Sequence, residues 1–190
     1  LVSENIHSVT ELAKDRMELC QIIEAMEKSD SNITAKQIVL LSMIATDIAS
    51  SLHWVSDITS VKLTYAAILF DCYANEHNSQ YLLDPKDHIQ KAVKLAENWK
   101  SCPSDVSTII LQHHERPNGS GFPNNLDYHR IAPLSAVFIV AHDLAESILK
   151  FGKDHLLESW LFAKEKEYSV GNFKKAFDVI RTQTQIQKAS

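Results

Sequence analysis

Apolar residues recur every three to four positions along most of this 190-residue chain, with polar residues between them. Such spacing brings the apolar side chains onto one face of an α-helix, and no segment shows the strict alternation of a β-strand. The pattern therefore predicts an all-α fold. Helices are expected at about residues 8–28, 34–52, 56–73, 85–99, 104–114, 133–148, 154–166 and 171–182.

Capping residues and prolines mark where several of these helices begin. Thr34 is suited to cap the second helix, and Ser56 with Thr59 offers a starting cap for the third. Pro85 and Pro133 suit the first turn of a helix, where a missing N–H group costs nothing. These signals support the helix starts taken from the apolar pattern.

The same pattern divides the chain into three parts. Residues 1–32 are expected to form an N-terminal linker or signalling helix, residues 33–183 a single helical domain, and residues 184–190 a fraying tail. The first helix carries a short heptad seam, broken by Arg16, with apolar positions Val9, Leu12, Leu19, Ile23 and Met26. Two interpretations stay open: this helix packs on its own domain, or it is a signalling helix that forms a homodimer with a second copy.

Composition narrows the class of protein. Apolar residues make up 45% of the chain and charged residues 23%, which suits a domain with a buried core rather than a disordered one. The formal net charge is −5 and the 19 basic residues do not cluster, so no nucleic-acid polymer is expected as a partner. No apolar run approaches the ~18 residues of a membrane span, and the odd, scattered cysteines suit reduced thiols in a cytoplasmic setting.

Side chains of the metal-ligating type stand out at five positions: Asp71, His88, His113, His114 and Asp143. Asp71 follows a strongly apolar segment and Asp143 lies inside an apolar helix, where a charged carboxylate must be paired or must coordinate a metal. Histidines and aspartates converging from several helices are what a two-metal hydrolase requires. Each of them also has a plainer interpretation, as a hydrogen-bonded carboxylate or as a core or surface histidine.

Residues 113–123, HHERPNGSGFP, resemble the signature of the HD-GYP family, in which HHE is followed by a Gly-x-Gly-Tyr-Pro loop. The matching residues are His113, His114, Glu115, Gly119, Gly121 and Pro123, with Phe122 in place of the tyrosine. The resemblance extends over about residues 34–182 and implies a helical bundle of the HD superfamily. It also implies a bacterial protein with two or three bound metal ions, often iron or manganese, that hydrolyses cyclic dinucleotides such as cyclic di-GMP.

The chain departs from this family where the first metal position is expected. Phe70 stands where the family's His-Asp doublet has its histidine, and a phenylalanine ring cannot donate to a metal. Gln37 stands at about the place of an earlier histidine and is a poor ligand. Of the ligands that the resemblance implies for this position, only Asp71 and Asp143 remain.

The neighbouring metal position is complete by the same resemblance. Its ligands are Asp71, His88 and His113, and all three are present. His114 belongs to a third position whose other ligands are missing. The resemblance therefore implies one ion of iron, manganese or zinc, held by three protein ligands and water, or no ion at all.

These losses favour a degenerate domain over an active hydrolase. Without a second ion the phosphoryl clamp is incomplete, and the lysine and arginine that the family places near its substrate are also absent. Each such loss costs roughly 10²–10³ in rate. We therefore expect a catalytically inactive signalling or protein-interaction module in cyclic-dinucleotide signalling. Its partner would be a cyclase, another regulator or a second copy of the chain, and the loop at 115–123 is a plausible docking surface.

Two alternatives stay open. One is a metal-dependent cyclic di-GMP phosphodiesterase with a remodelled site, which would draw on His142, Glu146, Lys150 or Glu115 for substitute ligands or charge. Because His142 directly precedes Asp143 on one helix, it is expected to point about 100° away from it and to stand apart from the same ion. The other alternative is a sensor that binds cyclic di-GMP without cleaving it.

Overall fold

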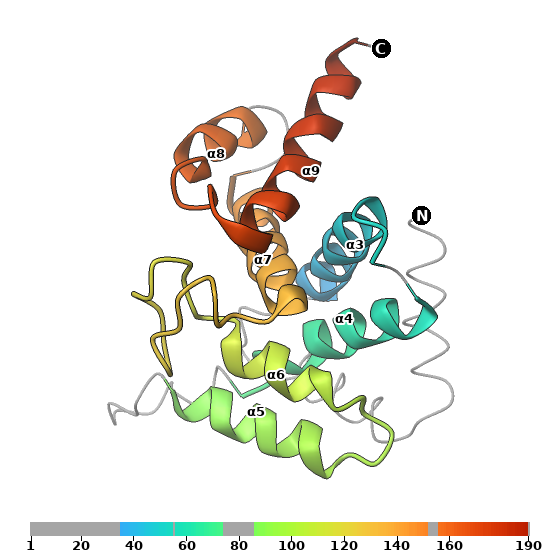
Figure 1. Cartoon of the computed structure of the whole chain (residues 1–190). Helices are drawn as coiled ribbons and strands as arrows, with labels where there is room; N and C mark the ends of the chain where they lie inside the picture. The colour runs from blue at the N-terminus through green and yellow to red at the C-terminus, as the bar shows by residue number, and fades with distance from the viewer. Residues whose placement is uncertain (1–34, 55, 74–85, 152–155, 190) are drawn as a thin grey trace.

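The computed structural model describes residues 35–54, 56–73, 86–151 and 156–189. Within those residues the chain forms helices and no strand, which confirms the all-α prediction (Figure 1). The helices are α3 (Ala35–Ser51), α4 (Asp57–Leu69), α5 (Asp87–Asn98), α6 (Asp105–Gln112), α7 (Pro133–Phe151), α8 (Leu156–Lys164) and α9 (Gly171–Ala189). The helix expected at 8–28 and the cap at Thr34 lie outside the described residues.

The predicted cap of α4 is present in the structure. The backbone N–H of Ser56 donates to Oγ1 of Thr59 over 3.3 Å, and the two hydroxyl oxygens lie 3.1 Å apart. The Thr59 hydroxyl also donates to the carbonyl of Trp54 over 3.1 Å, which ties the helix start to the preceding turn. These contacts satisfy polar groups that the first turn of a helix otherwise leaves unpaired.

Two helix ends differ from the prediction. The third predicted helix was expected to reach residue 73, but α4 ends at Leu69. Every residue at 63–70 is buried. The helix is covered on all sides there, so the apolar pattern does not show where the helix ends. At the other end of the chain, α9 continues to Ala189 through the segment expected to fray. Gln183 Nε2 donates to Asp47 Oδ2 of α3 over 2.7 Å, which anchors that part of α9.

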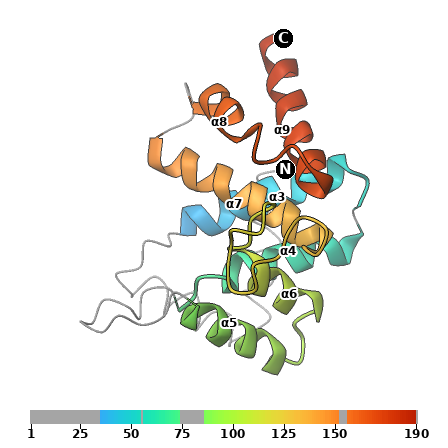
Figure 2. The ribbon, with the colours of Figure 1, turned by 60° about the vertical axis from the view of Figure 1, so that its left-hand side comes forward.

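Helix α7 is the centre of the bundle. It packs against α3, α6, α8 and α9, and residues 136–141 are at most 1% exposed. Figures 1 and 2 show α5 and α6 on one side of α7 and α8 and α9 on the other, with α3 alongside α7. The end of α4, the start of α5 and the end of α6 therefore come together beside α7. None of the helices in the described ranges is long and apolar enough to cross a membrane.

Candidate metal centre

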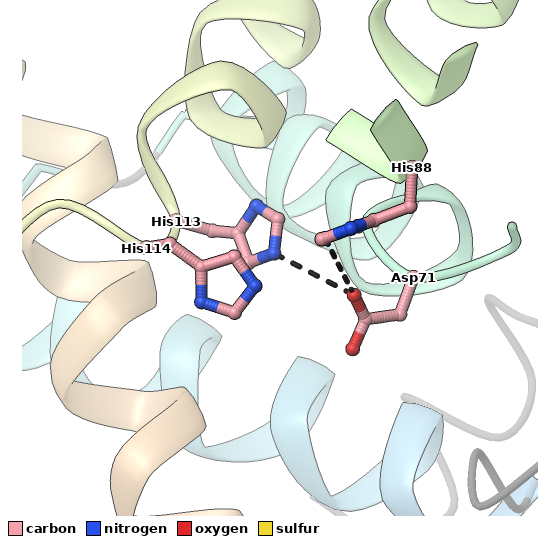
Figure 3. Close-up of side chains that lie close together, drawn as sticks. All are labelled: Asp71, His88, His113 and His114. Carbon is pink, nitrogen blue, oxygen red and sulfur yellow. Dashed lines mark ion pairs between the residues drawn. The ribbon is translucent and has the colours of Figure 1, made fainter. Parts of the chain in front are cut away.

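Four metal-ligating side chains meet where three helix ends come together (Figure 3). They are Asp71 in the turn after α4, His88 in the first turn of α5, and His113 and His114 directly after α6. Each offers one ligand atom, and the four atoms all lie within 4.8 Å of one another. Metal–ligand bonds to zinc are about 2.0–2.2 Å long, so the ligand atoms of one ion lie within roughly 4.4 Å of each other. This set, called the ligand cluster below, needs only small shifts to share one ion.

The carboxylate of Asp71 stands between two of the imidazoles. Its Oδ1 lies 3.5 Å from Nε2 of His88 and 3.6 Å from Nε2 of His113 (Figure 3). Both distances exceed those of a good hydrogen bond. Oδ1 of Asp71 and the two Nε2 atoms therefore face a common point, but they are too far apart for good hydrogen bonds.

The protonation of His113 follows from a local contact. Its Nδ1 lies 2.6 Å from the backbone carbonyl oxygen of Ile110, which can only accept a hydrogen bond. Nδ1 therefore carries a proton, and in the neutral imidazole Nε2 presents a lone pair toward the cluster. That Nε2 is buried and has no hydrogen-bond partner within the described parts of the chain. A buried acceptor without a donor is well satisfied by a metal ion.

Charge in the ligand cluster also suits a metal. Burial alone would raise the pKa of Asp71, but the interactions with His113, and then with His142 and His114, outweigh burial and hold the pKa below its ordinary value. Burial, with repulsion from His113, lowers the pKa of His114 to about 2. At neutral pH the carboxylate is thus ionised and the His114 imidazole neutral, which are the states in which they bind metals.

The glycine loop after α6 is held by Glu115, whose side chain is fully buried. Its carboxylate accepts the backbone N–H of Asn124 over 2.7 Å and that of Leu126 over 2.8 Å. A Cβ added at Gly121 would lie 2.4 Å from Cα of Glu115, so only glycine allows the loop to fold this close. In the structure, then, Glu115 organises the loop and is engaged in backbone hydrogen bonds rather than in the ligand cluster.

Phe122, at the signature tyrosine's place, contributes a ring contact. It stacks on His114 with ring centroids 4.5 Å apart and an angle of 21° between the planes. Gly119 has a positive φ of 76°, a backbone conformation that favours glycine. The loop thus presses its aromatic residue against one of the metal-ligating histidines, and Pro123 directly follows this contact.

Phe70 fills the space beside the ligand cluster with hydrocarbon. It is fully buried, and its ring meets those of His113, His142 and Phe138 edge-on at centroid distances of 5.3, 5.1 and 5.6 Å. Gln37, the other position expected to have lost a ligand, lies partly buried near the start of α3 and is not among the four clustered residues.

Asp143 lies apart from the ligand cluster, in an ion-pair network. Its carboxylate accepts hydrogen bonds from Arg116 at 3.1 and 3.3 Å, from Lys164 at 2.7 Å and from the hydroxyl of Tyr168. Burial alone would raise the pKa of Asp143, but these donors, with Arg116 foremost, lower it overall. The four residues are called the Asp143 clamp below. The structure thus groups Asp143 with cations and not with the other metal-ligand candidates.

Several residues of the site were not identified from the sequence. Arg116 directly follows the HHE segment, but nothing in its surroundings indicated a partner 27 residues further on. Lys164 and Tyr168 lie 21 and 25 residues beyond Asp143 and carry no motif. Their roles depend on how α8 and the following turn pack against α7.

His142 lies on the side of α7 that faces Phe70 and His113. Its side chain and that of Asp143 have different neighbours, as expected for consecutive helix residues. However, it is His142 whose ring lies beside His113, at a centroid distance of 6.4 Å. Burial, with repulsion from His113, lowers the pKa of His142.

A hollow of about 270 Å³ lies elsewhere, between α8 and α9. Its lining includes Phe162, Phe177 and Arg181, and none of the candidate metal ligands. The volume falls just below the usual ~300–1,000 Å³ of small-molecule sites. The ligand cluster, rather than this hollow, is the candidate centre for chemistry.

Comparison with known proteins gives one match. Residues 41–154 match the family model described as an HD domain. This range is more than half of the chain and contains the whole ligand cluster, Phe70 and Asp143. Searches of curated proteins and of solved structures found no match.

Proposed function

The chain belongs to the HD domain family, and we propose that within this family it is a degenerate HD-GYP-like domain that binds one metal ion and acts as a signalling module. An HD domain indicates a metal-dependent hydrolase-like fold, and the ligand cluster is a candidate metal site within it. The finer assignment to HD-GYP rests on the resemblance of residues 113–123, whose loop is built around Glu115 and Gly121.

The ion would be held by Asp71, His88, His113 and His114. One carboxylate and three imidazoles suit Fe²⁺, Mn²⁺ or Zn²⁺ rather than the all-oxygen sites of Mg²⁺ and Ca²⁺. The buried Nε2 of His113 and the ionised state of Asp71 support this assignment. When bound, such an ion polarises a phosphoryl oxygen as a Lewis acid.

The observation that carries the inactive assignment is the Asp143 clamp. Two-metal hydrolysis requires a second ion to complete the hold on the phosphoryl group. By the resemblance Asp143 would help to hold that ion, yet Arg116, Lys164 and Tyr168 already occupy its carboxylate. Freeing it would leave two partly buried cations without their main counter-charge, which is costly.

The proposed role is in bacterial cyclic-dinucleotide signalling, in the cytoplasm, with a protein as partner. A cyclase, another regulator or a second copy of the chain fits this role, and residues 1–32 would supply the link or dimer helix. The tightly held loop supports a docking role, since Asn118, Ser120, Asn124 and Asn125 are exposed on it. Polar side chains on a rigid loop present hydrogen-bonding groups at low entropic cost.

Metal content tests the first part of this proposal. The full chain is loaded with Fe²⁺ or Mn²⁺ without oxygen, desalted, and measured by elemental analysis. We expect one ion per chain, because only one complete ligand set is present among the described residues. A value of two would contradict the single-ion assignment, and a value of zero would remove the metal from the proposal.

Hydrolysis and binding assays separate the alternatives. We expect the metal-loaded protein to release no linear dinucleotide from cyclic di-GMP, since the second ion is missing. Clear hydrolysis would favour a phosphodiesterase with a remodelled site, and the position of His142 beside His113 is the observation that would then matter. Calorimetric binding of cyclic di-GMP without cleavage would favour the sensor.

A further inference from the structure

His142 lies at the edge of the ligand cluster without belonging to it. Its ring meets Phe70 at a centroid distance of 5.1 Å and His113 at 6.4 Å, nearly perpendicular to the latter at 86°. The ring of His113 also lies 4.0 Å from that of His114 and 5.7 Å from that of His88. His113 is therefore flanked by two ligand histidines and by one histidine that is not a ligand.

His142 is largely buried and lies beside the rings of Phe70 and His113. The residue is only 8% exposed, and the contacts of its ring are with other rings. It is close enough to Asp71 for the two to interact electrostatically. The cluster is open to solvent on one side, because Asp71 and His114 are partly exposed. An imidazole offers an N–H donor to any group that reaches it.

The net charge of the metal-loaded site favours one class of ligand. One carboxylate and three neutral imidazoles around a divalent ion leave a net positive charge, which attracts an oxyanion. The nearest basic side chains of the clamp, Arg116 and Lys164, are already bound to Asp143. His142, whose ring lies beside that of His113, is a further imidazole at this site.

We propose that His142 contacts the incoming ligand of this centre and donates a hydrogen bond to a phosphate-like oxyanion held at the ligand cluster. This inference rests on the proposed function, since it requires the ion to be bound. His142 would act on the oxyanion and not on the metal, because its ring nitrogens are not among the four ligand atoms that lie within 4.8 Å of one another.

The test uses the full chain and two substitutions. His142→Phe keeps a ring against Phe70 and removes the N–H, whereas His142→Asn keeps an N–H donor and loses the ring. Calorimetry measures Mn²⁺ affinity, and line broadening of the phosphorus resonance measures binding of inorganic phosphate to the Mn²⁺-loaded protein. Thermal unfolding checks that each variant is folded.

We expect H142F to bind Mn²⁺ as the wild type does and to bind phosphate about 2- to 10-fold more weakly, which is the worth of one hydrogen bond. H142N is expected to retain most of the phosphate affinity. Unchanged phosphate binding in H142F, or no phosphate binding by the wild type, would overturn the inference. Loss of Mn²⁺ binding in H142F would overturn it too, by making His142 a metal ligand. Failure of the wild type to bind Mn²⁺ refutes the proposed metal function first, before any variant is compared.

Discussion

The ligand cluster and the Asp143 clamp each bury an aspartate, but they offset its charge differently. Asp143 is surrounded by donors that the protein itself supplies, from Arg116, Lys164 and Tyr168. Among the described residues, Asp71 faces the histidines His88 and His113, at 3.5 and 3.6 Å. A carboxylate with fixed cations is satisfied by the fold, whereas one that faces imidazoles leaves room for an added positive charge. An aspartate next to apolar helical residues is therefore a structural residue at position 143 and a candidate metal ligand at position 71.

The largest expected effect is the loss of stability when Asp143, the central residue of the clamp, is replaced. Asp143→Ala should lower the free energy of unfolding by about 3 kcal/mol, because it leaves Arg116 and Lys164 without their main buried partner. The value lies at the lower end of the range for buried pairs, since Glu167 still faces both cations. Urea unfolding of the metal-free protein measures it.

The matched control is Asp178→Ala on α9. Asp178 also pairs with two cations, Lys174 and Arg181, but at the surface. Exposed ion pairs contribute about 0–1 kcal/mol, so a small change is expected there. Equal losses in the two variants would mean that the clamp is no more than a surface ion pair.

The next effect concerns metal affinity in the ligand cluster. Asp71→Asn keeps the shape of the side chain and removes its charge, so the fold should be retained while Mn²⁺ affinity falls. The fall should exceed the ~10- to 100-fold cost of losing an outer partner of a ligand, because a ligand itself is lost. Calorimetric titration with Mn²⁺ measures it.

Asp105→Asn serves as the control for this change. Asp105 is an exposed aspartate on α6 that pairs with Lys62, away from the cluster. Its substitution should leave Mn²⁺ affinity unchanged. If Asp71→Asn bound Mn²⁺ as tightly as Asp105→Asn does, Asp71 would not be a ligand.

The smallest effect is the pH dependence of the clamp. The pKa of Asp143 is lowered in the folded state from its usual 3.8, so the clamp stabilises the fold fully at higher pH. That stability is lost as the pH falls below 3.8 and through the folded-state pKa. The loss is about 1.4 kcal/mol for every pH unit that separates the two pKa values. The difference in unfolding free energy between the wild type and Asp143→Asn should therefore shrink in acid. A difference that stays constant with pH would show that Asp143 is not held ionised by its partners.

Some features of this protein follow from contacts between residues near in sequence. The all-α class and the start of α4 at Ser56 and Thr59 were predicted because both depend on residues three or four apart. The proton on Nδ1 of His113 depends on Ile110, three residues earlier, and is likewise a local matter. Helix geometry alone places such pairs together.

The helix ends were less predictable where burial is uniform. At 63–70 no exposed position interrupts the buried run, so the end of α4 at Leu69 left no trace in the apolar pattern. The resulting turn is what carries Asp71 toward the start of α5 and the end of α6.

The sequence by itself determined that Asp71, His88, His113 and His114 are candidates for a metal site, because their side chains are of the metal-ligating type. Only the tertiary structure decided that the four ligand atoms lie within 4.8 Å of one another and that Asp143 is bound by Arg116, Lys164 and Tyr168 instead. It also decided that His142 lies beside His113. The physical reason is that these contacts join different helices, so they depend on how the helices pack and not on the spacing of residues within any one of them.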